Sequence, residues 1–136
     1  MKEKKPKVLI GNLGLGGHEM GAILVAQVLR DAGMEVVYLG LGQSPESIVS
    51  AAIQEGVDII GISSMSAVHN ELIPELMELL KGKGIAHIPV ILGGIIPRDD
   101  EAVLRKAGVK EVFGPGTPGS KIVDSITQLT RATARL

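Results

Sequence analysis

Residues 7–21 read KVLIGNLGLGGHEMG, an apolar β-branched run followed by a glycine-rich loop and the start of a longer apolar segment. The run at Lys7–Gly11 predicts a buried strand. After the loop, apolar residues recur at intervals of three or four, namely Ala22, Val25, Ala26 and Leu29. This spacing is typical of a helix with one apolar face. The stretch therefore predicts a strand, a tight turn and a helix, in that order.

The same order of strand and helix repeats along the chain. Four further apolar runs predict strands at Glu35–Leu39, Asp58–Ser63, Pro89–Leu92 and Glu111–Phe113. A second helical stripe consists of Leu72, Leu76, Leu79 and Leu80. Helix ends are predicted from C-cap glycines and from N-caps followed by proline, namely Gly33, Gly82, Ser44-Pro45 and Thr117-Pro118. Together these signals predict five strand-helix units.

Strict alternation of strands and helices predicts a parallel sheet with helices on both faces, because parallel strands need crossover connections. We expect an α/β, flavodoxin-like (Rossmann-like) domain of three layers, with five strands in the order 2-1-3-4-5. The domain is expected over residues 7–131, after a solvated tail at 1–6. Ligands of such sheets bind beyond the carboxyl ends of the strands. The loops at 12–21, 64–69 and 93–98 are therefore the candidate ligand-binding loops.

The composition restricts the classes of function. A chain of 136 residues that is 45% apolar and 21% charged fits one soluble domain. Its net charge of -1 predicts no general attraction to nucleic acid or to an anionic membrane. It has no cysteine, no long apolar run and no signal-peptide pattern. We therefore expect a cytoplasmic protein without a nucleic-acid or membrane partner.

Four common functions of this fold do not match the loops. A dinucleotide site would need glycine in place of Glu19 and an acid in place of Gly40, and a phosphate-binding Walker loop would need Gly-Lys-Ser/Thr. A response-regulator receiver needs acids after the first strand and an aspartate at the end of the third, where Asn12 and Ser63 stand. Flavodoxins usually hold the flavin between aromatic rings, which make up only 1% of this chain.

A single histidine, His18, remains in the glycine-rich loop. Imidazole can coordinate cobalt, although a lone histidine is often only a polar side chain. The loop at 14–21, GLGGHEMG, resembles the Asp-x-His-x-x-Gly loop of cobalamin-binding domains in methylmalonyl-CoA mutase and its relatives. GISSM at 61–65 is similar to that family's Ser-x-Leu segment, GGIIP at 93–97 to its Gly-Gly loop, and FGPGT at 113–117 to its closing turn. The resemblance extends from about residue 7 to residue 126.

The resemblance implies that the tail base of the cofactor leaves the cobalt and inserts between the first helix and the sheet. His18 would then be the lower axial ligand of cobalt, and Ser63 would hydrogen-bond the tail base beside Met65. Glycines would leave room for the tail, and Thr117 would lie near the nucleotide end. The expected cofactor-binding residues are Gly16, Gly17, His18, Glu19, Gly21, Ser63, Met65, Gly93, Gly94 and Thr117, with His18 as the metal ligand.

Two positions depart from the family's pattern. The family's aspartate, which accepts a hydrogen bond from the ligand histidine, is Gly16 in this chain, and the lysine that supports the aspartate is Asn12. Loss of such a carboxylate typically costs about 10- to 100-fold in metal affinity or activity. One alternative is therefore a paralogue with weakened or lost cobalamin binding that acts as a structural or regulatory subunit. A corrinoid methyl-carrier protein is the other.

The resemblance implies the small subunit of a coenzyme B12-dependent acyl-CoA mutase, an isomerase that rearranges carbon skeletons by radical chemistry with adenosylcobalamin. A substrate barrel alone takes about 250 residues, so this chain has no room for one. We expect a separate large barrel subunit to bind the acyl-CoA and to determine which acyl-CoA reacts, with cobalamin between the two chains. No catalytic residue is expected on this chain alone, and the isolated chain should show no mutase activity.

Overall fold

A computed structural model of the chain describes residues 5–13, 20–64 and 69–134, and strands and helices alternate throughout that part. The strands are β1 (Lys7–Leu13), β2 (Glu35–Gln43), β3 (Ile59–Ser64), β4 (Val90–Gly94) and β5 (Glu111–Phe113). The helices are α1 (Met20–Asp31), α2 (Pro45–Glu55), α3 (His69–Gly82), α4 (Arg98–Ala107) and α5 (Gly119–Ala134). Among the described residues, no helix combines the length and the apolar composition that a membrane span requires.

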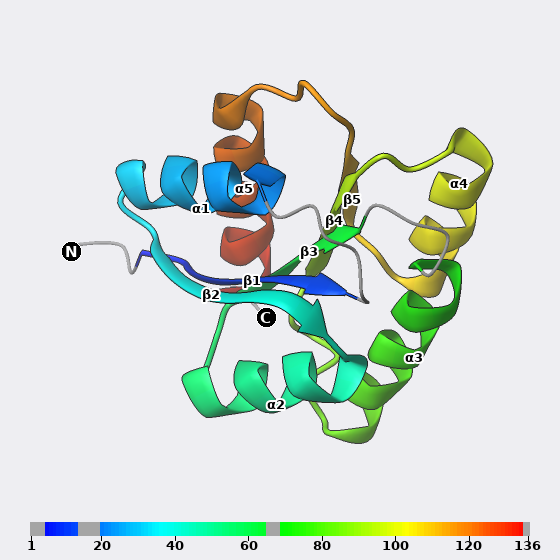
Figure 1. The fold of residues 1–136 in the computed structure, drawn as a ribbon. Helices are drawn as coiled ribbons and strands as arrows, with labels where there is room; N and C mark the ends of the chain where they lie inside the picture. Colours follow the sequence, from blue (N-terminus) through cyan, green and yellow to red (C-terminus); the bar gives the residue numbers. More distant parts are fainter. Residues whose placement is uncertain (1–4, 14–19, 65–68, 135–136) are drawn as a thin grey trace.

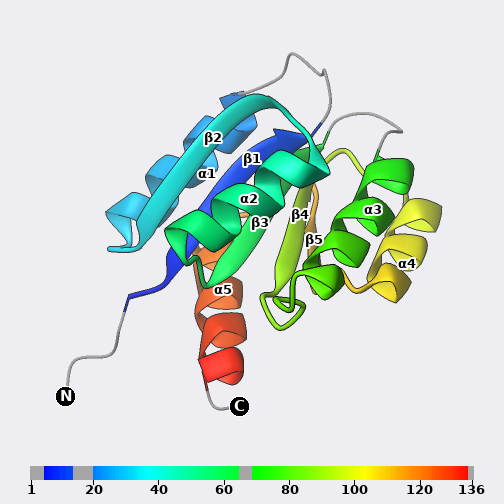
Figure 2. The same ribbon diagram turned by 90° about the horizontal axis from the view of Figure 1, so that it is seen from below.

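The five strands form one parallel sheet in the order β2-β1-β3-β4-β5, which confirms the predicted topology. Helices α1 and α5 cover one face of the sheet, and α2 and α3 cover the other, with α4 beside α3 (Figure 1). The view from below shows α2 and α3 in front of the strands and α1 behind them (Figure 2). The predicted arrangement of three layers is therefore confirmed.

Each face of the sheet has its own apolar core, because consecutive side chains of a strand point to opposite faces. In β3, Ile59 packs in the core under α1 and α5, while Ile60 packs in the core under α2, α3 and α4. Both side chains are fully buried. Burying one such side chain stabilises the fold by about 1.5–3 kcal/mol. A strand that is buried on both faces therefore reads as a continuous apolar run.

Strands β1 and β2 continue beyond the ends predicted from the apolar runs. The prediction ended them at Gly11 and Leu39, whereas the strands end at Leu13 and Gln43. The pairing of β1 with β2 shifts register at Gly11, and the added residues still contribute main-chain hydrogen bonds to the ladder. Main-chain pairing does not require an apolar side chain, so the apolar pattern alone predicted strands that were too short.

The predicted cap of α2 is confirmed, and that of α3 is corrected. At α2 the Ser44 hydroxyl accepts a hydrogen bond from the Ser47 N–H at 3.1 Å, and the Ser47 hydroxyl accepts one from the Ser44 N–H at 2.9 Å. Gly33, with φ +89°, follows the end of α1 as predicted. Gly82, however, is still helical, and the left-handed residue after α3 is Gly84, with φ +75°. Helical spacing alone could not distinguish these two glycines.

Glu75 on α3 gives the fold a testable dependence on pH. Loss of hydration raises the pKa of Glu75 above the usual 4.5, and the negative charge of Glu46 on α2 raises it further. A carboxyl group whose pKa is higher in the folded state than in the unfolded state destabilises the fold when it is ionised. Glu75→Gln is therefore expected to raise the melting temperature at pH 7.

The rise in melting temperature caused by Glu75→Gln should disappear as the pH falls through the raised pKa of Glu75 and below 4.5. Under those conditions Glu75 is protonated in both the folded and the unfolded state. Thermal unfolding followed by circular dichroism between pH 3 and pH 8 would measure this. Glu78→Gln, at an exposed position of the same helix, is the control for the change in charge. A gain from Glu75→Gln that persists at acid pH would contradict the electrostatic explanation.

Candidate functional site

Small residues occupy the face of β3 and β4 that lies under α1 and α5. Gly61 and Ser63 follow Ile59 at intervals of two, so they share its face of the sheet. On β4, Gly93 pairs with Ser63 and points the same way. No large side chain rises from these three positions. The carboxyl half of this face is therefore left partly uncovered.

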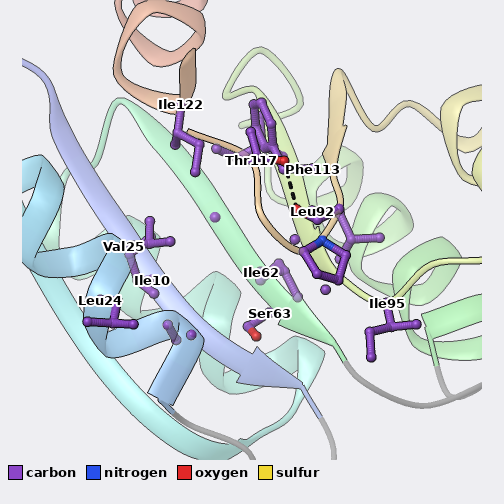
Figure 3. Close-up of a pocket in the computed structure, with 18 of the residues that line it drawn as sticks. Ile10, Leu24, Val25, Ile62, Ser63, Leu92, Ile95, Phe113, Thr117 and Ile122 are labelled. Atoms are coloured by element: carbon purple, nitrogen blue, oxygen red, sulfur yellow. Dashed lines mark hydrogen bonds between the residues drawn. The ribbon is translucent and has the colours of Figure 1, made fainter. Parts of the chain in front are cut away.

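A cavity of about 430 Å³ lies over these small residues. Its floor includes Ile10 and Gly61, and Leu24 and Val25 of α1 form one wall. The strand end at Phe113 and Ile122 of α5 lie opposite (Figure 3). The volume falls within the range of about 300–1,000 Å³ that is usual for small-molecule sites. The cavity therefore has the size of a ligand site.

The cavity lies beside the carboxyl ends of the central strands, where the fold predicts a ligand. Strand order reverses between β1 and β3, because β1 pairs with β2 on one side and with β3 on the other. Leu24 on α1 and Ile95 after β4 both line the cavity, and each is 58% exposed. The site is therefore a pocket with an apolar mouth rather than a closed void.

Two of the glycines in the pocket are not required by packing within the chain. A Cβ atom at Gly21 would have no atom within 4 Å, and one at Gly93 would have only the Phe113 carbonyl oxygen, at 3.9 Å. At Gly61 a Cβ atom would come within 2.8 Å of the Ile10 side chain. Both glycines line the pocket, so side chains at 21 and 93 would have room to extend into it. The space that they leave suits a flat apolar ring, such as the base of the cobalamin tail.

Hydroxyl groups are the polar side-chain groups among the pocket residues that the structure describes. Ser63 is half-buried, and its hydroxyl makes no hydrogen bond within the described part of the chain. The Thr117 hydroxyl donates to the Gly114 carbonyl oxygen at 2.7 Å, so it closes the turn after β5. The prediction that Thr117 caps α5 is therefore wrong by one residue. The helix begins at Gly119, and the Pro118 carbonyl accepts its first hydrogen bond.

The pocket brings together every predicted site residue that the structure describes. These are Gly21, Ser63, Gly93, Gly94 and Thr117, which come from α1, β3, β4 and the turn before α5. The remaining predicted residues lie outside the described residues: Gly16, Gly17, His18, Glu19 and Met65. The assignment of His18 as the cobalt ligand therefore stays a prediction. Within residues 5–13, 20–64 and 69–134 no group of three or more acidic, histidine or cysteine side chains could hold a metal ion.

Several residues that form the pocket were not among the predicted site residues, including Ile10, Gly61, Phe113 and Ile122. The signal for Gly61 was present, because a glycine two residues before Ser63 must share its face of the strand. The apolar side chains gave no such signal, since their spacing predicts burial without distinguishing a packed core from a pocket wall. Asn12, in the place of the family's lysine, is 5% exposed and pairs with Ser63 across β1 and β3.

A doubly wound parallel sheet with an apolar pocket beside its carboxyl edge defines an α/β domain that binds a small molecule at the switch point. A comparison with protein families identifies the family to which this domain belongs. The model of the B12 binding domain matches residues 6–123, and the chain belongs to that family.

Curated relatives include two proteins of similar length. The chain is 44% identical over 132 residues to the 2-hydroxyisobutanoyl-CoA mutase small subunit of Aquincola tertiaricarbonis, covering 97% of each chain. It is 44% identical over 123 residues to the pivalyl-CoA mutase small subunit of Xanthobacter autotrophicus, covering 90% of this chain and 82% of that one. The chain is also 41% identical to the methylmalonyl-CoA mutase of Cereibacter sphaeroides. That match covers 94% of this chain but only 18% of the larger enzyme.

Solved structures share the fold at lower sequence identity. A cobalamin-binding protein from Desulfitobacterium hafniense superposes with a TM-score of 0.80 at 21% identity, over 93% of this chain and 59% of that one. A signal receiver domain from Vibrio parahaemolyticus superposes with a TM-score of 0.72 at 13% identity, over 96% of this chain and 94% of that one. Both matches establish the flavodoxin-like architecture alone, because proteins of different function share it.

Proposed function

We propose that this chain is the cobalamin-binding small subunit of an adenosylcobalamin-dependent acyl-CoA mutase. The observation that carries the proposal is the position of the pocket. Five residues that the family resemblance assigns to the cofactor line one apolar cavity at the switch point of the sheet. The two relatives of similar length, which are small subunits of acyl-CoA mutases, support the same function.

In this proposal the nucleotide tail of the cofactor occupies the pocket between α1 and the sheet. Ser63 donates a hydrogen bond to the tail base, and Gly21 and Gly93 let the tail approach the main chain. Thr117 lies at the turn before α5, toward the nucleotide end. The apolar walls exclude water from the base, so the tail contributes binding energy through burial of its ring.

Bound adenosylcobalamin supplies the cobalt-carbon bond whose homolysis starts the radical rearrangement. The part of this chain is to bind and orient the cofactor: His18 would ligate the cobalt, and the exposed Leu24 and Ile95 would offer apolar contacts to the cofactor. A separate large subunit, which we propose to be a barrel, binds the acyl-CoA above the cofactor. The choice of acyl-CoA then belongs to that subunit.

Replacing His18 tests the metal ligand directly. Cobalamin added to the purified chain is expected to give the absorption spectrum of a base-off cofactor with a histidine ligand. In His18→Ala that spectrum should be replaced by one without nitrogen coordination, because the imidazole no longer reaches cobalt. His87→Ala is the matched control, since His87 is exposed and precedes β4 at the opposite edge of the sheet. Equal spectra from His18→Ala and the wild type would refute the assignment.

Restoring the family's carboxylate is expected to strengthen binding. Gly16→Asp places a carboxylate two residues before His18. In the family's pattern this position is the aspartate that accepts a hydrogen bond from the ligand histidine. The affinity for cobalamin, measured by equilibrium titration, should rise by about 10- to 100-fold, because an outer-shell carboxylate orients the imidazole and raises its basicity. Gly17→Asp adds the same charge one residue away and should give no such gain. An unchanged affinity in Gly16→Asp would show that the imidazole already has another acceptor.

The second candidate function is a paralogue with weakened or lost cobalamin binding, which the residues Gly16 and Asn12 favour. The same titration distinguishes it from the proposed function. A wild-type chain that leaves the cobalamin spectrum unchanged, while still associating with a large mutase subunit, would favour the paralogue. A His-ligated spectrum would favour the mutase subunit.

A further inference from the structure

We infer that the contact between Gly119, the first residue of α5, and Val28 on α1 sets the width of the pocket between these two helices. Neither residue lines the pocket. Gly119 is therefore a positioning residue, which acts on the ligand through α1. This role rests on the proposed function, because that function places the nucleotide tail of the cofactor beside α1.

The packing at Gly119 leaves no room for a side chain. A Cβ atom there would lie 2.8 Å from Cγ1 of Val28 and 3.3 Å from Cγ2, whereas non-bonded carbon atoms approach to about 3.5–4.0 Å. A valine in a helix strongly prefers one side-chain rotamer, so Val28 cannot easily turn away. Gly119 is not among the glycines with a positive φ, so its main chain would accept alanine. The contact with α1 is what requires glycine here.

The contact joins the two helices whose side chains form opposite walls of the pocket. On α1, Leu24 and Val25 line the pocket, and Val28 follows Val25 by about one helical turn. On α5, Ile122 lines the pocket and follows Gly119 by three residues (Figure 3). The separation of α1 and α5 at this contact therefore controls the distance between the walls.

The start of α5 is the fixed side of the contact. In the turn before it, the Thr117 hydroxyl and the Thr117 N–H both donate to the Gly114 carbonyl oxygen, at 2.7 Å and 3.3 Å. Pro118 follows, and its ring restricts its φ angle. Further along the helix, Ile122 and Ile126 are buried in the core of this face. The position of Gly119 is thus held from both sides.

Helix α1 is held less firmly at the end that lines the pocket. The buried residues of its first two turns are Ala22 and Ala26, and its large buried side chain, Leu29, comes in the third turn. Burial stabilises a side chain in proportion to its apolar area, so a methyl group contributes much less than the side chain of leucine or isoleucine. A methyl group added at Gly119 should therefore displace α1 and leave α5 in place.

Gly119→Ala is expected to weaken cobalamin binding by about 5- to 20-fold in an equilibrium titration. A gap that widens by about 0.5–1 Å loses about a quarter to a half of the van der Waals attraction between a wall and the ring beside it. Cobinamide, a corrinoid without the nucleotide tail, does not fill the pocket, so its affinity should stay unchanged. A variant that had only lost stability would not distinguish these two ligands.

A second substitution should restore binding. Val28→Ala removes the two methyl groups that lie closest to position 119 and leaves the Cβ atom of residue 28 at 3.6 Å, an ordinary contact distance. The double variant of Gly119→Ala and Val28→Ala should bind cobalamin within about 2-fold of Val28→Ala alone. Gly82→Ala is the matched control, because Gly82 is a helical glycine with no atom within 4 Å of its Cβ position. Circular dichroism checks that each variant is folded.

The outcomes separate the role of Gly119 from the proposed function. The role of Gly119 is overturned if Gly119→Ala leaves cobalamin binding unchanged, weakens cobalamin and cobinamide equally, or is not rescued by Val28→Ala, while cobalamin binding by the wild type stands. A wild-type chain that binds neither corrinoid would overturn the proposed function and the role of Gly119 together. A loss confined to cobalamin and reversed by Val28→Ala supports both.

Discussion

Replacement of Gly94 by alanine is expected to destabilise the domain by about 2–5 kcal/mol, since strained backbone and overpacking add their costs. Gly94 ends β4 beside Ser64, which ends β3. Its φ of +135° lies in a region that side chains disfavour, and a Cβ atom there would overlap the Ser64 carbonyl oxygen. That oxygen belongs to the main chain of a central strand, so it cannot move aside without disturbing the sheet. Thermal unfolding should show a melting temperature lower by roughly 6 to 15 °C.

The neighbouring glycine supplies the control for this loss of stability. Gly93→Ala places a methyl group whose nearest neighbour is the Phe113 carbonyl oxygen, at 3.9 Å. Its stability should stay within about 0.5 kcal/mol of the wild type, as for most substitutions without a steric conflict. Comparable losses in Gly93→Ala and Gly94→Ala would mean that the strand end, rather than the conformation of Gly94, is sensitive to any side chain.

Gly93→Leu is expected to abolish most cobalamin binding while the domain still folds. The isobutyl group would extend into the cavity of about 430 Å³, where the proposed tail lies. Displacing the tail should lower the affinity by about 100-fold or more, equivalent to about 2.7 kcal/mol. The added side chain fills apolar space, so the unfolding free energy should be little changed. Equilibrium titration and thermal unfolding of the same sample measure both effects.

Two variants make this result specific. Gly93→Ala adds less volume and should weaken binding by less than Gly93→Leu does. Gly82→Leu, at the exposed end of α3 with no atom within 4 Å of its Cβ position, should leave binding unchanged. If Gly93→Leu binds cobalamin as tightly as the wild type, the ligand does not occupy this pocket, and the assignment of Ser63 and Gly93 to the site fails with it.

Most of the fold could be predicted because it depends on patterns within short segments. Alternation of apolar runs with helical stripes predicted every described strand, and the expected flavodoxin-like class predicted the strand order that the sheet adopts. The errors occur where two residues satisfy the same local rule. Gly82 and Gly84 both suit the end of α3, and the chain uses Gly84 because its main chain turns left-handed there. Apolar patterns likewise could not predict how far β2 continues, since its ladder extends to Gln43 through main-chain pairing.

The polar and glycine positions of the candidate site were predicted from the family resemblance of segments that the fold brings to one edge. Gly21, Ser63 and Gly93 lie far apart in sequence, yet Gly21 lies in the first turn of α1, and Ser63 and Gly93 are the last residues but one of β3 and β4. The walls were not predictable in this way. Ile10 and Ile122 have the spacing of ordinary core residues, and both do belong to the core under α1 and α5. Only their position beside small residues makes them part of a pocket.

The sequence by itself determined the alternation of elements, the parallel sheet and the edge at which a ligand would bind, because these depend on periodicity and on the covalent order of strands. Tertiary structure alone decided that this edge holds a cavity and that Ser63 and Thr117 are the polar side chains among its described lining residues. The cavity forms where Gly61, Ser63 and Gly93 from two strands meet under helices α1 and α5. No local pattern contains that information, since packing joins residues that are distant along the chain.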